Sequence, residues 1–255
     1  MDEKKNNVSR PASSAVKKGK KDKNLCENLN YAAKEAFKRL RANVLLALPE
    51  EDAEGCRIIG VTSAQPTEGK STIAINTAFS LAELEKKVLL IDSDMRRPSI
   101  HTKLELPQIP GLSNLLSDSN AISAAIKTYH SSEGAISFDI IPAGNPPKNP
   151  SEILTSNRME KLLNALTGAY DYIILDLPPV GAVIDAVSVG KHTDGMIVVV
   201  RENNCPVEVF DDCVEQLKFA DIPILGFVVN GALEGAGKGY GYKYKYGGYG
   251  KYKYY

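Results

Sequence analysis

The chain has 255 residues, 43% of them hydrophobic, and its 31 basic side chains balance its 31 acidic ones. That length allows one large α/β domain with a filled core. The composition excludes a membrane span, because no apolar run approaches roughly 18–20 residues. It also excludes a signal peptide, because the first 24 residues are polar and rich in Lys, so we expect a cytoplasmic protein.

The neutral total conceals two basic ends and an acidic middle. Residues 1–23 carry eight Lys or Arg and three acids, and residues 237–255 carry five Lys and no acid, which leaves residues 24–236 at −10. We expect residues 1–29 to form a disordered basic arm. Alternatively, this basic arm is attracted to an anionic membrane, to nucleic acid or to the acidic body of the same protein.

The four cysteines show no metal-binding or redox pattern. They lack CxxC spacing and have no histidine at ligand spacing, so we interpret them as reduced structural thiols. They are Cys26, Cys56, Cys205 and Cys213.

Apolar residues at helical spacing predict a first helix over residues 30–48. The strands expected after it are residues 57–63, 87–92, 138–142, 172–177, 196–201 and 224–230, and the helices are 70–85, a short one within 114–129, 151–166 and 207–220. The strands are apolar without polar alternation and are interleaved with helices, which indicates a parallel sheet covered on both faces. We predict an α/β fold over residues 30–236, with the doubly wound, mostly parallel sheet of a P-loop NTPase.

A phosphate-binding loop follows the first expected strand. Residues 64–71, Ala-Gln-Pro-Thr-Glu-Gly-Lys-Ser, fit the Walker A pattern with Ala64 in place of the first glycine. Successive backbone N–H groups and the start of the next helix form a cradle for anions. Lys70 is placed to reach the outer phosphates and Ser71 to bind Mg²⁺. The predicted nucleotide contacts are Pro66, Thr67, Glu68, Gly69, Lys70, Ser71 and Thr72.

Two further strands end in acidic residues. One ends in Asp92-Ser93-Asp94-Met95-Arg96, and the other in Asp176 followed by Leu-Pro-Pro. Ligands of open parallel sheets bind beyond the carboxyl ends of the strands. We therefore expect Lys70, Ser71 and these three aspartates to converge on one Mg²⁺–phosphate site.

The C-terminal segment concentrates tyrosine. Eight of the last sixteen residues are Tyr, alternating with Gly and Lys. Residues 237–255 contain no aliphatic face to bury, so we expect a flexible tail. It offers a row of phenolic hydroxyls, and the candidate phosphoacceptors are Tyr240, Tyr242, Tyr244, Tyr246, Tyr249, Tyr252, Tyr254 and Tyr255.

These motifs together resemble the bacterial protein-tyrosine kinases (BY-kinases), P-loop enzymes with Walker A, A′ and B motifs. Residues 147–154 and 180–185 are similar to further segments of that family, and the tyrosine cluster is its hallmark. The resemblance covers about residues 31–255. It is closest to the soluble Gram-positive form of the capsular or exopolysaccharide type, in which the kinase and its membrane activator are separate chains.

The resemblance implies an enzyme that transfers phosphate from ATP to protein tyrosine with Mg²⁺ as cofactor. It implies autophosphorylation of the tail in trans, regulating capsular or extracellular polysaccharide synthesis and export. In the implied site Lys70 grips ATP, Ser71, Asp94 and Asp176 hold Mg²⁺, and Asp92 accepts the tyrosine proton or orients the hydroxyl; the roles of Asp92 and Asp94 are open to exchange. Arg96 either neutralises phosphate charge or forms a salt bridge within the fold, and Asn230 resembles the residue that reads adenine in related ATPases.

The family's partners follow from the same resemblance. They are a transmembrane activator or polysaccharide co-polymerase adaptor, which recruits the kinase to the inner face of the plasma membrane, and a cognate tyrosine phosphatase. A Glu-x-x-Arg-x-x-Arg motif joins subunits into a ring, and Glu35, Lys38 and Arg41 occupy its places here. Lys38 loses the planar, bidentate geometry of arginine, and a solvated charged helix face is the alternative interpretation.

Two other functions compete with the kinase. A positioning ATPase of the ParA/MinD type shares the fold and the phosphate loop, but it carries a lysine early in that loop, where this chain has Ser63-Ala64-Gln65-Pro66. Interleaved aromatic and basic residues in the tail also suit single-stranded RNA. No RNA-binding fold accompanies them, so we expect no nucleic-acid partner.

Overall fold

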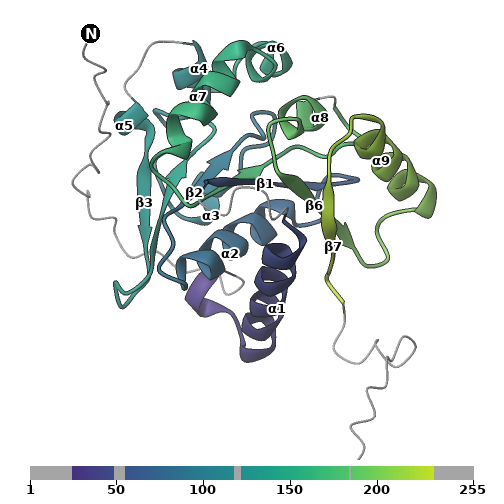
Figure 1. Ribbon diagram of the computed structural model, residues 1–255, viewed down its shortest axis with the longest axis horizontal. Helices are drawn as coiled ribbons and strands as arrows, with labels where there is room; N and C mark the ends of the chain where they lie inside the picture. The colour runs from purple at the N-terminus through teal and green to yellow at the C-terminus, as the bar shows by residue number, and fades with distance from the viewer. Residues whose placement is uncertain (1–24, 49–54, 118–121, 184, 233–255) are drawn as a thin grey trace, which may run out of the picture.

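The computed structural model describes residues 25–48, 55–117, 122–183 and 185–232. Through these residues runs one seven-stranded sheet, in the order β3-β4-β2-β5-β1-β6-β7, with helices on both faces (Figure 1). Every neighbouring pair of strands is parallel except β3 and β4. The predicted doubly wound, mostly parallel sheet is therefore confirmed. Residues 1–24 of the predicted arm, and the tyrosine tail, lie outside the described residues.

The strands are β1 Arg57–Ser63, β2 Val88–Asp92, β3 Lys127–His130, β4 Ser137–Ile141, β5 Tyr172–Asp176, β6 Gly195–Arg201 and β7 Ile224–Asn230. The helices are η1 Cys26–Asn28, α1 Tyr31–Ala47, α2 Lys70–Ala82, α3 Ile100–Lys103, α4 Leu112–Ser117, α5 Ile122–Ala125, α6 Pro150–Leu154, α7 Asn157–Thr167, α8 Asp185–Gly190 and α9 Val207–Phe219. Among the described residues, none of these helices has the length and apolar character needed to cross a bilayer.

Each face of the sheet has its own hydrophobic core. On one face, α1, α2 and α3 pack against the strands, and on the other face α4 to α9 do so (Figure 1). The central strands β2 and β5 are buried on both faces, since all five residues of β2 and four of the five in β5 are buried. This burial explains why their sequences read as continuous apolar runs.

The segment from 114 to 129 differs from the single short helix predicted there. It holds the end of α4, then α5, and then β3, which pairs antiparallel with β4. The Thr128 hydroxyl donates to the Asp139 carboxylate over 2.7 Å, and the rings of Tyr129 and Phe138 lie 5.2 Å apart. These cross-strand pairs stabilise β3, and they involve residues that a local pattern does not connect.

The helix predicted over 151–166 is two helices. The Thr155 hydroxyl donates to the carbonyl of Ser151, and the Ser156 hydroxyl donates to that of Ile153. Ser156 then takes an extended conformation as the N-cap residue of α7. Hydroxyl side chains compete with the backbone for helix carbonyls, which ends α6 at this point.

The folded part of the chain begins earlier than the predicted boundary at residue 30. Leu25 and Cys26 are only 3% and 1% exposed and belong to the core under α2. The Cys26 N–H donates to the Asn76 side chain over 2.7 Å. The Glu27 carboxylate accepts hydrogen bonds from the Tyr129 hydroxyl and the Ser132 N–H. Residues 25–29 therefore belong to the domain rather than to the basic arm.

Candidate active site

The phosphate loop joins β1 to α2, and β1 lies between β5 and β6 near the middle of the sheet. Gly69 precedes α2 with φ at +96°. A Cβ at this position would lie 2.1 Å from the Asn230 side-chain nitrogen, so only glycine fits. Thr67 also has a positive φ of +67°, which a β-branched residue adopts only at a cost of about 1–3 kcal/mol. The surrounding structure holds this loop in a shape that its sequence does not favour.

The side chains of Glu68 and Asn230, two predicted nucleotide contacts, form hydrogen bonds that hold the loop. The Glu68 carboxylate is fully buried and accepts from the Gln65 N–H over 2.9 Å and, more weakly, from the Arg201 N–H over 3.4 Å. The Asn230 side-chain amide donates to the Glu68 carbonyl over 2.8 Å. Neither side chain lines the cavity described below. They tie the loop to the ends of β6 and β7.

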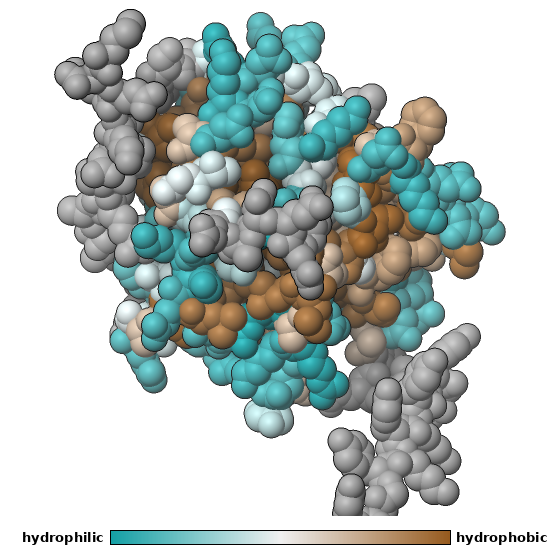
Figure 2. Space-filling model, viewed as in Figure 1, coloured by the Kyte–Doolittle hydropathy of each residue, from teal (hydrophilic) through white to brown (hydrophobic). Residues whose placement is uncertain are grey.

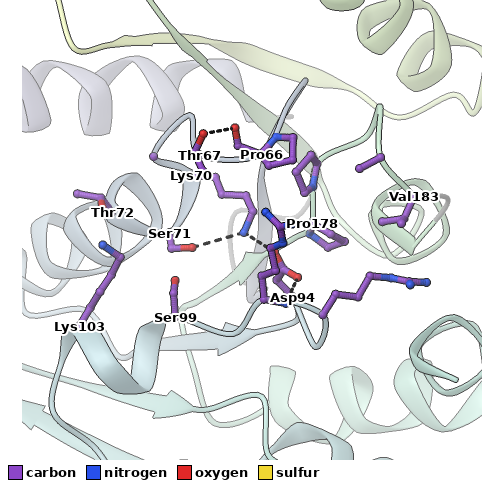
Figure 3. Close-up of a pocket in the computed structure, with 15 residues that line it drawn as sticks. Pro66, Thr67, Lys70, Ser71, Thr72, Asp94, Ser99, Lys103, Pro178 and Val183 are labelled. Atoms are coloured by element: carbon purple, nitrogen blue, oxygen red, sulfur yellow. Dashed lines mark hydrogen bonds and ion pairs between the residues drawn. The ribbon is translucent and has the colours of Figure 1, made fainter. Parts of the chain in front are cut away.

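The charged residues of the three strand ends do meet. Lys70 Nζ lies 2.8 Å from Asp94 Oδ2 and 3.4 Å from Asp176 Oδ1. The Ser71 hydroxyl is 3.4 Å from the same nitrogen (Figure 3). Asp92 and Asp176 are register partners at the carboxyl ends of β2 and β5. Parallel strands thus bring residues from three separate motifs to one edge of the sheet.

Burial and mutual charge shift the titration of this group. Burial raises the pKa of Asp92 to about 8, and the negative charge of Asp176 adds to the rise. Burial also raises the pKa of Asp176. Burial works to lower the pKa of Lys70, but the charges of Asp176 and Asp94 outweigh it, so that this pKa is raised and the ammonium stays charged.

The two acids of the Asp-x-Asp motif occupy different layers. Asp92 is fully buried, and one carboxylate oxygen accepts from the N–H groups of Ser99 and Ile100 over 3.2 and 3.1 Å. Asp94 lines the cavity, and its second oxygen accepts from the Arg97 N–H over 2.9 Å. Only Asp94 of this pair can therefore touch a bound ligand directly in the arrangement described.

Arg96 lines the cavity but is also fixed by the fold. Its Nε lies 2.9 Å from Asp185 Oδ2, and a terminal nitrogen donates to the Ser151 hydroxyl over 2.8 Å. These contacts join the loop after β2 to α8 and α6. Of the two alternatives left by the sequence, the salt bridge within the fold is present.

A cavity of about 430 Å³ opens beside these residues, a size in the range of small-molecule sites. Its walls are Pro66, Thr67, Gly69, Lys70, Ser71, Thr72, Asp94, Arg96, Arg97, Ser99, Lys103, Pro178, Pro179, Ala182 and Val183. Figure 3 shows Lys103 and Thr72 on the wall beyond Ser71, and Val183 on the other side. Sequence reasoning missed Arg97 and Lys103. Arg97 adjoins the Asp-x-Asp-x-Arg motif, which was a usable signal, whereas only the position of α3 brings Lys103 here.

The donor atoms fit a Mg²⁺ ion that shares its ligands with a phosphate. Among the described residues, no group of three or more His, Cys, Asp or Glu could hold a metal by itself. Mg²⁺ is commonly bound by one or two carboxylates, with phosphate oxygens and water completing its shell. Within the same described residues, the buried oxygen Asp176 Oδ2 accepts no hydrogen bond. An unpaired buried carboxylate oxygen calls for a nearby cation.

The three predicted oligomerisation residues lie on α1. Lys38 Nζ pairs with Glu35 in the same helix over 2.7 Å. The Arg41 guanidinium donates to the Ser80 carbonyl at the end of α2 and lies 3.2 Å from Glu83. Arg41 therefore joins α1 to the helix that begins at the phosphate loop. Its part in an oligomer stays a prediction.

The chain is similar to a known protein family and to bacterial tyrosine-protein kinases. The family model described as an AAA domain matches residues 56–219. The tyrosine-protein kinase YwqD of Bacillus subtilis is 34% identical over 197 residues, which cover 77% of this chain and 80% of that protein. The Escherichia coli K12 kinase etk is 33% identical over 82% of this chain, but over only 28% of its own length.

Solved structures of bacterial tyrosine-kinase domains are also similar to this chain. The kinase domain of Escherichia coli ETK has a TM-score of 0.73 and 32% identity, covering 83% of this chain and 80% of that one. The chimerical protein CapA2B2 has a TM-score of 0.73 and 31% identity, covering 82% and 88%. MinD of Pyrococcus horikoshii, at 24% identity and a TM-score of 0.54 over 68% and 70%, shares the fold alone.

The fold and the site thus define a nucleotide-binding P-loop protein of the AAA-domain class. The chain belongs to the bacterial protein-tyrosine kinases, and its activity is that of a tyrosine-protein kinase. YwqD and etk are both kinases, whereas MinD resembles the chain only in fold.

Proposed function

We propose that this kinase uses Mg-ATP to phosphorylate its own C-terminal tyrosine cluster, in trans between subunits of an oligomer. The observation that carries the proposal is the group of Lys70, Asp94 and Asp176 beside the cavity, in a chain whose last sixteen residues include eight tyrosines. The kinase domain then spans residues 25–236, and residues 237–255 form the acceptor segment.

Different residues bind the phosphates and the Mg²⁺ ion. Lys70 and the N–H groups at the start of α2 bind the phosphates, because an ammonium and a helix N-terminus both favour anions. Ser71 and Asp176 would hold Mg²⁺, which supplies neutralisation of phosphate charge when bound. Since Lys70 contacts both carboxylates, an approaching phosphate competes with Asp94 and Asp176 for its ammonium.

Geometry favours Asp94 over Asp92 for the contact with the acceptor hydroxyl. Asp94 lines the cavity, so we assign it the contact with the acceptor hydroxyl, whose proton a carboxylate can take as phosphate is transferred. Asp92 lies beneath it and accepts from the first N–H groups of α3. Asp92 then positions α3 together with its N-cap residue Ser99, and Ser99 and Lys103 both lie on the cavity wall. Adenine recognition by Asn230 remains a prediction.

The partners belong to the same proposal. The chain works with a separate transmembrane activator of a polysaccharide system, which recruits it to the inner face of the membrane, and a tyrosine phosphatase reverses the modification. Two similar proteins support this setting: one from Klebsiella pneumoniae is described as a putative tyrosine-protein kinase in the cps region, and one from Staphylococcus aureus as the putative tyrosine-protein kinase CapB. Glu35, Lys38 and Arg41 would join the subunits.

The test is to incubate the purified chain with Mg-ATP, with and without an activator fragment, and to map modified residues by mass spectrometry. We expect phosphate on residues within 240–255 that is absent from a Lys70→Met control. Hydrolysis of ATP with unmodified tail tyrosines, even with the activator fragment, would contradict the proposal and favour the positioning ATPase.

A further inference from the structure

A second groove lies between α8 and α9, on the face of the sheet opposite α1 and α2 (Figure 1). Its volume is about 670 Å³. Val187, Phe219 and Ala220 provide apolar walls, Asp212 and Glu215 on α9 provide an acidic rim, and Lys191 and Gln216 complete the lining. Hydrophobic and hydrophilic surfaces lie side by side over this part of the molecule, at the right of Figure 2. The groove is separate from the cavity beside the phosphate loop.

One side of α9 continues the acidic rim. Glu208, Asp212, Glu215 and Phe219 follow at spacings of four, three and four residues, which places them along one side of a helix. The Phe219 ring is 93% exposed at the end of this row. Within the described part of the chain, none of the three acids forms an ion pair. The row therefore presents unpaired negative charge that ends in an exposed aromatic ring.

The C-terminal segment of the chain has the complementary composition. Residues 233–255 contain five Lys and eight Tyr, and Glu234 is their one acid. Lysines pair with carboxylates, and tyrosine rings pack against an exposed phenylalanine and aliphatic side chains. Residues 24–236 carry a net charge of −10, but the groove adds an apolar wall to that general attraction. Charge and aromatic content thus select the same segment as occupant.

We propose that residues 233–255 dock in the α8–α9 groove of their own chain while the tyrosines are unmodified, and that tyrosine phosphorylation releases them. The inference rests on the proposed autophosphorylation of the tail for its release step. Docking itself requires only the unmodified segment.

The segment can reach the groove. The described chain ends at Ala232, just past β7, and α9 is the helix before β7, with Phe210 and Phe227 in edge-to-face contact at 5.2 Å. Phe219 lies near the amino end of β7, a seven-residue strand about 23 Å long. Twenty-three residues extend to about 75 Å. Even with a turn after Ala232, most of the tyrosines can lie along α9.

Docking has a consequence for the kinase reaction. The groove is near the amino end of β7, whereas the phosphate site is at the carboxyl ends of the strands. Docked tyrosines are therefore held away from the phosphate site of their own chain. Each phosphate adds about −1.5 to −2 charges, which the acids of α9 repel. The first modifications thus free the remaining tyrosines, and tail phosphorylation accelerates as it proceeds.

The first test uses carbodiimide coupling of lysines to carboxylates in the unmodified full chain, mapped by mass spectrometry. We expect crosslinks from tail lysines to Glu208, Asp212 and Glu215. The variant Asp212→Lys/Glu215→Lys also removes the two reactive carboxylates, so the informative readout there is the remaining crosslink to Glu208, which should fall roughly threefold or more. The matched control Glu133→Lys/Glu160→Lys changes net charge equally at exposed sites elsewhere and should leave all three crosslinks unchanged.

Phe219→Ala provides a second variant in which all the acids remain. We expect it to lower the crosslink yield to Asp212 and Glu215, and to raise the initial rate of tail phosphorylation roughly twofold or more while activity on an external tyrosine peptide stays the same. Mixing isotope-labelled and unlabelled chains separates docking within a chain from docking between chains. Crosslinks only between chains, or yields equal in all variants, would overturn the proposal. Crosslinks in a chain whose tail is never phosphorylated would support docking while contradicting the proposed autophosphorylation.

Discussion

Lys70 contributes both to catalysis and to stability, because its ammonium is buried between two carboxylates. Replacing it with methionine leaves Asp94 and Asp176 without their cation in a site with little water. We expect Lys70→Met to lower kinase activity at least about 100-fold, since a charge aimed at the reacting phosphates is lost. We also expect the free energy of unfolding to fall by about 3 kcal/mol, measured by urea unfolding.

Lys70→Arg is the matched control for that prediction. It keeps the positive charge between the carboxylates but replaces the compact ammonium with a planar guanidinium. We expect most of the stability to return while activity stays low. Equal stability of the methionine variant and the unmodified chain would show that the two carboxylates do not need Lys70 in the folded protein.

Asn230 offers a choice between two roles that kinetics can separate. Its amide donates to the Glu68 carbonyl, so Asn230→Ala loosens the phosphate loop whatever base the nucleotide carries. Loss of one hydrogen bond of about 0.5–1.5 kcal/mol predicts a roughly 2- to 12-fold rise in KM for both ATP and GTP. A rise for ATP alone would instead establish contact with adenine, as the sequence first suggested.

At the scale of elements, Arg41 is the contact that fixes α1 against α2. Its side chain is mostly buried, bonds the Ser80 carbonyl and pairs with Glu83. We expect Arg41→Ala to lower the free energy of unfolding by about 1.5–3 kcal/mol, the usual range for a hydrogen bond to a charged group. Lys38→Ala, which removes an exposed pair within one helix, should change it by less than about 0.5 kcal/mol. Thermal and urea unfolding of both variants measure the difference, and equal losses would contradict it.

Elements whose signals are local followed from the sequence, and those decided by distant contacts did not. The observed bounds of β1 and β7 match the predicted ones residue by residue, because apolar runs and the Walker A motif are local patterns. The antiparallel strand β3 was missed, since its stability comes from pairing with β4. Lys70 and Ser71 were found through the local Walker A motif, and the three aspartates because they lie at or just after the ends of apolar strands. Lys103 was missed because only packing of α3 brings it to the cavity.

The start of the folded domain is a prediction at the same scale. Removing residues 1–24 should leave the unfolding midpoint unchanged, since Leu25 and Cys26 keep their buried positions. Removing residues 1–29 deletes both of them and the bonds of Glu27 to Tyr129 and Ser132. Burial of one leucine alone is worth about 1.5–3 kcal/mol, so we expect a loss of at least about 2 kcal/mol. Equal midpoints for the two truncations would place the boundary after residue 29.

At the scale of the whole molecule, the separation of charge matters more than the neutral total. Residues 237–255 carry five Lys, and residues 24–236 carry the excess of acids. A basic tail is therefore attracted to the negatively charged body of a neighbouring subunit. Such attraction between exposed charges weakens as salt rises, because the screening length is about 8 Å at physiological ionic strength.

Phosphorylation should loosen the proposed oligomer. Modifying all eight tyrosines adds about −12 to −16 charges, so the tail changes from basic to strongly acidic and is repelled by the body of every subunit. We expect the mass measured by light scattering to fall after incubation with Mg-ATP and to recover after treatment with a tyrosine phosphatase. A chain with the eight tail tyrosines replaced by phenylalanine is the control, and its mass should not respond to ATP. Equal mass before and after complete phosphorylation would show that tail charge does not hold the subunits together, and would leave α1 to account for the assembly.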